Sequence, residues 1–194
     1  MSQDLLQRLL RLEAIEAIRG LKAHYSALAD AKYTGNYQRQ PAEHMRELAQ
    51  QQAACFTEQA VWFGGEFGGD RIGRQALAQW FERSPWCWAA HYYLSPQITI
   101  AEDLKHASAT WLLWQLALRD DNREAIFLTA TTQETYAHCD GQGWLIDSMR
   151  FAGLHVMPAN AGFMPLHPDL ASLDKARLPL NDPEPASSTG QREQ

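Results

Sequence analysis

Cysteine is scarce in this chain of 194 residues, where only Cys55, Cys87 and Cys139 occur. They are odd in number and widely spaced, and no CxxC pair is present, so the sequence predicts neither a disulfide framework nor a cysteine-rich zinc site. An HExxH motif is missing as well, and we expect no metal centre. Reduced thiols are typical of cytoplasmic proteins, which is the location we expect.

Long apolar runs and an excess of positive charge are also lacking. No run approaches the roughly 20 residues of a membrane span, and no basic segment followed by an apolar one suggests a secretion signal. Lys and Arg number 17 against 23 Asp and Glu, which gives a formal net charge of -6. Because nucleic acids and anionic membranes attract basic surfaces, we expect neither as a partner.

The residues that are present predict a single α+β domain. Leucine, isoleucine and tyrosine recur at helical spacing near the N-terminus, and alternating apolar runs separated by short turns fill the second half. The expected helices cover 3–31, 41–55 and 74–83, with a short strand at 60–63 and long strands near 88–101, 107–119, 125–138 and 143–155. Long strands joined by short turns favour an antiparallel, strongly curved sheet with one face packed on the helices.

The C-terminal part differs in composition from the rest of the chain. We expect the domain to span 1–157, an extension to cover 158–180, and the Pro-, Ser- and Glu-containing residues 181–194 to form a disordered tail. Residues 156–170 are apolar but aperiodic. They fit an ordered coil over a pocket or over a neighbouring subunit.

Tryptophan is unusually frequent, with seven residues in the chain. Trp62, Trp86, Trp88 and Trp114 fall in or beside the expected sheet. One interpretation is that they fill the core; the other is that some of them line a concave pocket for a flat, apolar ligand.

Two isolated polar residues, Asp30 and His91, are candidates for catalysis. Asp30 follows the last apolar position of the first expected helix, where the helix dipole disfavours an acid. His91 is the histidine of an apolar, aromatic strand segment. Each residue could have only a structural role. If the fold brings them together, they form an acid–base dyad in an apolar pocket.

The order of elements and several local strings resemble the SnoaL-like branch of the nuclear transport factor 2-like superfamily. The strings are Glu13 to Leu21, Tyr25 to Asp30, Phe56 to Trp62, Gly73 to Phe81, Ala90 to Ile98 and Gly143 to Ile146. The resemblance covers roughly 8–157 and implies a cone-shaped α+β barrel, with the sheet wrapped around the N-terminal helices. The likeness is greatest to the scytalone dehydratase and bile-acid 7α-dehydratase branch.

That resemblance also implies roles for particular residues. Lyases of the superfamily place an acid at the end of the first helix and a histidine on a facing strand, where Asp30 and His91 stand, and a tyrosine corresponding to Tyr25. The expected reaction is a dehydration, dehydrohalogenation or isomerisation of a small hydrophobic cyclic molecule without a cofactor, in which His91 acts as the base. Expected substrate contacts are Trp62, Trp86, Tyr93, Trp114, Thr131 and Arg150, and the role of Arg150 depends on the facing of the last strand.

A different class of function stays open. Relatives of this fold serve as small subunits of ring-hydroxylating dioxygenases, in which the barrel supports assembly and performs no chemistry. The apolar residues 156–170 and an exposed sheet face favour association into a homo-oligomer, a dimer or a trimer. An inaccessible His91 that lies away from Asp30 would favour this alternative.

Overall fold

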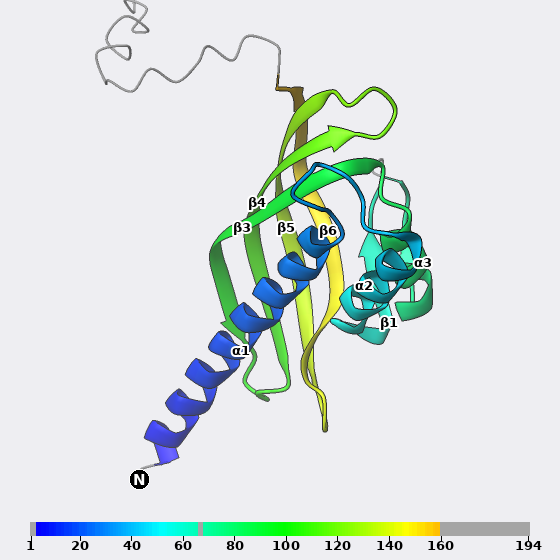
Figure 1. Cartoon of the computed structure of the whole chain (residues 1–194). Coiled ribbons are helices and arrows are strands. Elements are labelled where there is room, and N and C mark those ends of the chain that lie inside the picture. Colours follow the sequence, from blue (N-terminus) through cyan, green and yellow to red (C-terminus); the bar gives the residue numbers. More distant parts are fainter. Residues whose placement is uncertain (1–2, 66–67, 160–194) are drawn as a thin grey trace, which may run out of the picture. The chain divides into compact units, whose positions relative to one another are not determined.

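In the computed structural model, which describes residues 3–65 and 68–159, helices cover one face of a single sheet (Figure 1). The elements are α1 (Gln3–Ala31), α2 (Ala42–Ala54), β1 (Phe56–Phe63), β2 (Arg71–Ile72), α3 (Arg74–Glu82), β3 (Trp86–Ile100), β4 (His106–Arg119), β5 (Ala125–Cys139) and β6 (Gly143–Pro158). The expected helices and long strands are confirmed to within about three residues, while β1 begins four residues early and β2 was not predicted. The extension at 158–180 lies almost entirely, and the tail at 181–194 entirely, outside the described residues.

The sheet has the strand order β2-β1-β6-β5-β4-β3. Its long strands pair antiparallel, and β1 runs parallel to β6. The α+β class and the curved, mostly antiparallel sheet are therefore confirmed. The cone is open in the described part of the chain, because β2 and β3 are edge strands that do not pair with each other.

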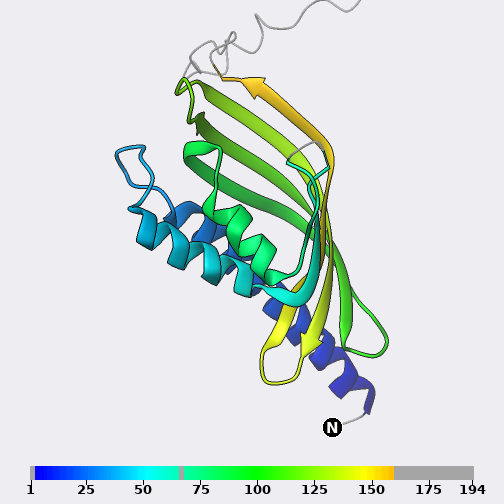
Figure 2. The same ribbon diagram turned by 90° about the vertical axis from the view of Figure 1, so that its right-hand side faces the viewer.

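The helix α1 lies along the inner side of the curved sheet, and its first turns extend past it (Figure 2). Its buried positions recur at helical spacing, and they are Ala14, Ile18, Lys22, Tyr25, Leu28 and Ala29. The leucines of the first three turns are exposed. Only the second half of α1 therefore gains stability by burying apolar surface against the sheet, and that half ends at Asp30.

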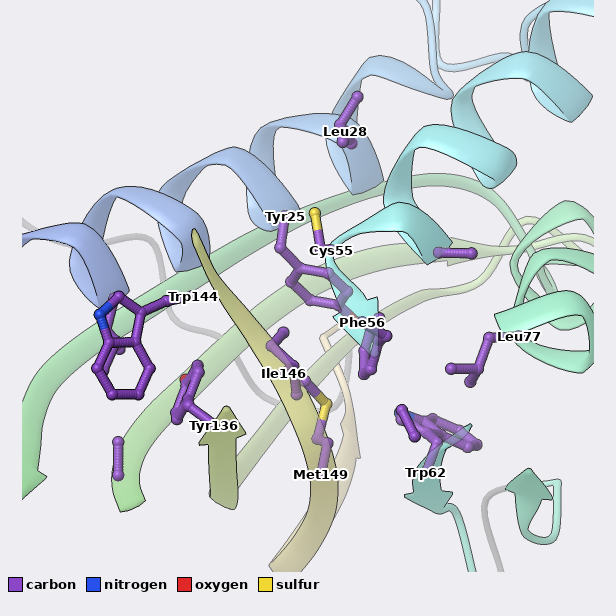
Figure 3. Packing of buried hydrophobic residues seen from close by; sticks show 14 of the residues in the cluster. Tyr25, Leu28, Cys55, Phe56, Trp62, Leu77, Tyr136, Trp144, Ile146 and Met149 are labelled. Atoms are coloured by element: carbon purple, nitrogen blue, oxygen red, sulfur yellow. The ribbon is translucent and has the colours of Figure 1, made fainter. Parts of the chain in front are cut away.

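The main core lies between the helices and the inner face of the sheet (Figure 3). Phe56 of β1, Leu77 of α3 and Ile146 of β6 are completely buried there, and each contributes about 1.5–3 kcal/mol through the removal of apolar surface from water. Tyr25 packs edge-on against Phe56, with ring centroids 5.7 Å apart. These contacts fix α1 on the sheet and therefore fix the position of its C-terminal turn.

Candidate active site

Asp30 and His91 meet where the end of α1 crosses the edge strand β3. Asp30 Oδ1 lies 2.8 Å from His91 Nδ1 and accepts the backbone N–H of His91 at 3.0 Å. One turn earlier on α1, the Ser26 hydroxyl donates to the backbone carbonyl of His91 at 3.0 Å. An edge strand has backbone N–H and carbonyl groups that no neighbouring strand pairs. On β3, an edge of the described sheet, the side chains of Asp30 and Ser26 supply the hydrogen bonds that a further strand would otherwise make with His91. The helix thus fixes both the ring and the backbone of His91.

The contact with Asp30 determines which ring nitrogen carries the proton. An ionised carboxylate only accepts hydrogen bonds, so Nδ1–H donates to Asp30 and the neutral ring keeps its lone pair on Nε2. Within 3–65 and 68–159, Nε2 has no hydrogen-bond partner. The His91 side chain is 16% exposed and that of Asp30 is 39% exposed, so the dyad is accessible from outside.

His91 contributes to the wall of an internal cavity of about 80 Å³. The aromatic residues that line this cavity come from the helices α1 and α3 and from the strands β1, β3 and β6. They are Tyr25, Trp62, Trp80, Phe81, Trp86, Tyr93 and Phe151. Asp30 does not line the cavity and borders a wider groove between α1 and β3, to which His91 also belongs. Because Nδ1 faces Asp30, Nε2 lies on the ring edge that is remote from Asp30.

Four of the expected pocket residues lie on this cavity: Tyr25, Trp62, Trp86 and Tyr93. Tyr25 is 5% exposed, and burial raises the pKa of its hydroxyl well above the ordinary value, as it does for Tyr93. The Tyr25 and Tyr93 rings meet edge-on, with centroids 6.0 Å apart. Both phenols therefore stay protonated at neutral pH.

Three other expected substrate contacts, Trp114, Thr131 and Arg150, lie on the outer face of the sheet instead. Trp114 is 50% exposed and pairs across strands with Thr129, while Thr131 alternates with buried neighbours on both sides. Arg150 is exposed, and its guanidinium stacks on the Phe63 ring at 4.0 Å. The expectation that these residues line the pocket was wrong.

A bulge explains why Arg150 points outward. In the first part of β6 the buried side chains include Trp144 and Ile146, and simple alternation would turn Arg150 inward with them. The pairing of β5 with β6 shifts by one residue at Asp147, between Ile146 and Ser148. The extra residue reverses the alternation, so Met149 faces inward and Arg150 faces outward.

Sequence reasoning missed a buried ionic network beside the cavity. Lys22 Nζ lies 2.5 Å from Glu134 Oε1, with both side chains completely buried, and the Glu134 carboxylate also accepts hydrogen bonds from Thr132 and Tyr136. The Lys22 ammonium lies 3.7 Å from the centre of the Tyr93 ring. Burial outweighs the attraction of Glu134 and lowers the pKa of Lys22. A signal existed, since Lys22 interrupts the apolar stripe of α1.

Further buried polar residues on the cavity were also missed, among them Lys32 and Gln115. Lys32 follows α1 in a polar segment that resembles an ordinary surface loop, and Gln115 alternates with apolar residues on both faces of β4. Neither position carries a sequence signal of burial. For a metal, the described residues offer no group of three or more His, Cys, Asp or Glu side chains that could hold an ion.

The described helices include none long and apolar enough to cross a membrane. The α+β fold, with helices on one face of a curved, mostly antiparallel sheet, is that of the cone-like proteins that the sequence resembles. Residues 10–150 match the family model of the SnoaL-like domain, and the chain therefore belongs to that family.

Solved structures share the fold at low sequence identity. The hexachlorocyclohexane dehydrochlorinase LinA-type3 from Novosphingobium barchaimii is 16% identical with a TM-score of 0.61, covering 81% of this chain and 99% of that one. A nuclear transport factor 2-like protein from Novosphingobium aromaticivorans is 18% identical with a TM-score of 0.60, covering 84% and 93%. A provisionally assigned scytalone dehydratase from the same organism is 15% identical with a TM-score of 0.58, covering 80% and 92%. No curated protein matches the chain significantly.

Proposed function

We propose that the protein is a cofactor-independent lyase or isomerase that uses His91 as a base on a small hydrophobic cyclic molecule. One observation carries this proposal: His91 lines an aromatic cavity, and its 2.8 Å contact from Nδ1 to Asp30 Oδ1 leaves the lone pair on Nε2, away from Asp30. The accessible, paired His91 also argues against a purely structural assembly subunit.

The chemistry follows from this arrangement. His91 Nε2 removes a proton from a ring carbon, and Asp30 stabilises the imidazolium that forms. In an elimination, the electrons of the broken C–H bond form a C=C bond, and the leaving group departs with its own bonding pair. The protonated Tyr25 hydroxyl donates a hydrogen bond to the departing group. The aromatic wall holds the apolar ring and excludes water.

The names of two structural neighbours, a dehydrochlorinase and a dehydratase, describe eliminations of this kind. They support the proposed reaction type and leave the substrate open. A cavity of about 80 Å³ favours a small compound.

The proposal is tested by a turnover screen with halogenated cyclohexanes and cyclic hydroxy-ketones, followed by chloride release and by ultraviolet absorbance of the new double bond. His91→Ala should lower the rate on any substrate found by roughly 10²–10⁴-fold. His106→Ala is the matched control, because His106 Nδ1 also pairs with a carboxylate, that of Asp103, at 2.7 Å, but in an exposed turn. Undiminished turnover by both His91→Ala and Asp30→Asn would exclude this mechanism.

We also propose that the protein is a homo-oligomer. The outer face of the sheet carries a contiguous apolar patch, which we call the outer patch, formed by Tyr92, Leu94, Leu112, Trp114 and Leu116, each 41% to 51% exposed. Tyr92 pairs with Trp114 and Leu94 with Leu112 across β3 and β4, so the side chains adjoin. A surface of this kind typically binds a partner, and a second copy of the chain is the simplest.

A further inference from the structure

The side chain of Gln115 lies next to His91 on the inner face of the sheet. The two residues are directly opposite each other on β3 and β4. The backbone N–H and carbonyl of His91 both bond to side chains of α1, so this is a non-hydrogen-bonded pair, in which opposite Cα atoms approach to about 4.5 Å and side chains are closest. Both residues line the cavity. Gln115 thus stands beside the ring that we assign as the base.

The amide of Gln115 is buried without a full set of partners. The residue is 4% exposed, and its Nε2 atom has no hydrogen-bond partner within the described part of the chain. A buried donor that is left unpaired destabilises the folded protein, and native proteins rarely retain one without a reason. A ligand in the cavity would supply the missing partner. Rotation of the amide lets it present either a donor or an acceptor, so the other groups in the cavity decide which atom the ligand must offer.

Lys32 indicates that the ligand must offer a hydrogen-bond acceptor in this cavity. Its side chain is buried and lines the same cavity, where Nζ donates to Gln52 Oε1 at 3.0 Å and to the backbone carbonyl of Phe81 at 3.1 Å. An ammonium has three donors and no acceptor, so one N–H stays without a partner among residues 3–65 and 68–159. Burial lowers the pKa of Lys32 to about 8, against the opposing attraction of Asp30. A ligand atom that satisfies Lys32 must be an acceptor with negative charge or partial negative charge.

We propose that Lys32 and Gln115 form an oxygen-binding subsite that holds a carbonyl or oxyanion of the ligand beside His91. This inference rests on the proposed function for its chemistry and narrows the substrate to ring compounds that carry an acceptor oxygen. Removal of a proton from the carbon next to a carbonyl breaks the C–H bond, forms Nε2–H, and places the electron pair on the carbonyl oxygen. Lys32 and Gln115 then donate to that oxyanion, while Tyr25 is left for the departing group.

The test measures binding instead of turnover, so it can fail independently of the dyad. The probes are 4-nitrophenol, whose phenolate presents an oxyanion on a ring, and 4-nitrotoluene, which has nearly the same size and no such oxygen. Binding is followed by quenching of the fluorescence of the tryptophans that line the cavity. The wild-type protein should bind the phenolate at least about tenfold more tightly than the toluene, as expected for hydrogen bonds to a charged group.

Substitution of either residue should remove this preference. Lys32→Met and Gln115→Leu should each weaken phenolate binding by about tenfold and leave 4-nitrotoluene binding within about twofold. If an apolar variant fails to fold, Lys32→Gln and Gln115→Glu replace it in the test, because they keep a polar side chain at each position. Gln115→Glu should repel the phenolate. Gln133→Leu, at an exposed position of the outer sheet face, is the matched control.

Three results would overturn the subsite: a wild-type protein that binds both probes equally, one that binds neither, or variants that keep the preference for the phenolate. A loss of affinity for both probes in the variants would indicate a collapsed cavity and would also count against it. If the phenolate preference depends on Lys32 and Gln115 while His91→Ala leaves turnover unchanged, the subsite stands and the proposed catalytic dyad does not.

Discussion

The carboxylate of Asp30 holds His91 at two points, since its Oδ1 atom lies 2.8 Å from the ring Nδ1 and 3.0 Å from the backbone nitrogen. One side chain therefore has a structural task, which is to satisfy an edge strand, and a chemical task, which is to orient an imidazole. Removal of the Asp30 side chain affects both tasks at once. Only a substitution that keeps one task and removes the other can separate the effect on stability from the effect on catalysis.

Asp30→Asn should separate the two tasks. The amide oxygen still accepts the backbone N–H of His91, so we expect the free energy of unfolding to fall by about 1 kcal/mol or less. The neutral amide cannot stabilise the imidazolium, and we expect the rate on any substrate to fall by roughly 10²-fold or more. Asp30→Ala should add a loss of stability. Chemical denaturation and steady-state rates measure the two effects, and equal losses of stability for Asn and Ala would contradict the structural task.

The buried pair of Lys22 and Glu134 should behave as a unit. Lys22→Met leaves the Glu134 carboxylate without its cation in a fully buried site, and we expect a loss of roughly 3–5 kcal/mol. The double variant Lys22→Met/Glu134→Gln removes both charges and should recover a large part of that loss. Urea denaturation of the wild type, both single variants and the double variant gives the coupling energy. Additive losses would show that the two side chains do not interact in solution.

The sequence identified the dyad because each member breaks a strong local pattern. Asp30 is an acid at the wrong end of an apolar helix, and His91 is a lone histidine in an aromatic strand. The helix period places Asp30 reliably, and the resemblance supplied the pairing across 61 positions. Hydrophobic periodicity alone cannot supply such a contact, because it fixes a face of an element and not its partner.

The facing of the sheet residues could not be predicted in the same way. On β4 both rows of alternate side chains are apolar, one with Trp111 and Leu113, the other with Leu112 and Trp114, so the pattern cannot say which row faces the helices. On β6 the bulge at Asp147 reverses the alternation, and no glycine or proline marks it. Buried Lys32 and Gln115 escaped for a related reason: their burial follows from packing between distant elements.

Lys32 gives the stability of the fold a specific pH dependence. Its pKa in the folded protein is lowered to about 8, whereas an unfolded lysine titrates near 10.4. Between these values the unfolded chain binds more protons, so the free energy of unfolding rises with pH. Relative to Lys32→Met, the wild type should gain on the order of 2–3 kcal/mol between about pH 8 and pH 10. Lys22 has a pKa shift of the same sign, but it is present in both proteins and cancels in the comparison.

Guanidinium denaturation at several pH values between 7 and 10 measures this difference. Near the upper limit the buried tyrosines add the opposite slope, because their pKa values are raised in the folded protein and unfolded tyrosines begin to ionise there. This contribution is present in both proteins and cancels in the comparison. Lys105→Met, at an exposed lysine in the turn after β3, is the control and should leave the slope unchanged. Parallel pH profiles for the wild type and Lys32→Met would mean that Lys32 is not buried in solution.

Trp114 should control self-association through the outer patch. It lies at the centre of that patch, with the exposed side chains of Tyr92, Leu112 and Leu116 around it. Trp114→Asp places a charge where two apolar surfaces would meet, and a desolvated, unpaired charge costs far more than the roughly 1–3 kcal/mol of a lost apolar contact. We expect size-exclusion chromatography with light scattering to give a dimer or trimer for the wild type and a monomer for the variant.

Gln133→Asp is the control for Trp114→Asp. It adds the same charge on the outer face of β5, outside the patch, and should keep the oligomer. Because Trp114 faces away from the cavity, the monomeric variant should still prefer 4-nitrophenolate over 4-nitrotoluene. A wild-type monomer, or a Trp114→Asp variant of unchanged mass, would show that the outer patch does not bind a second copy.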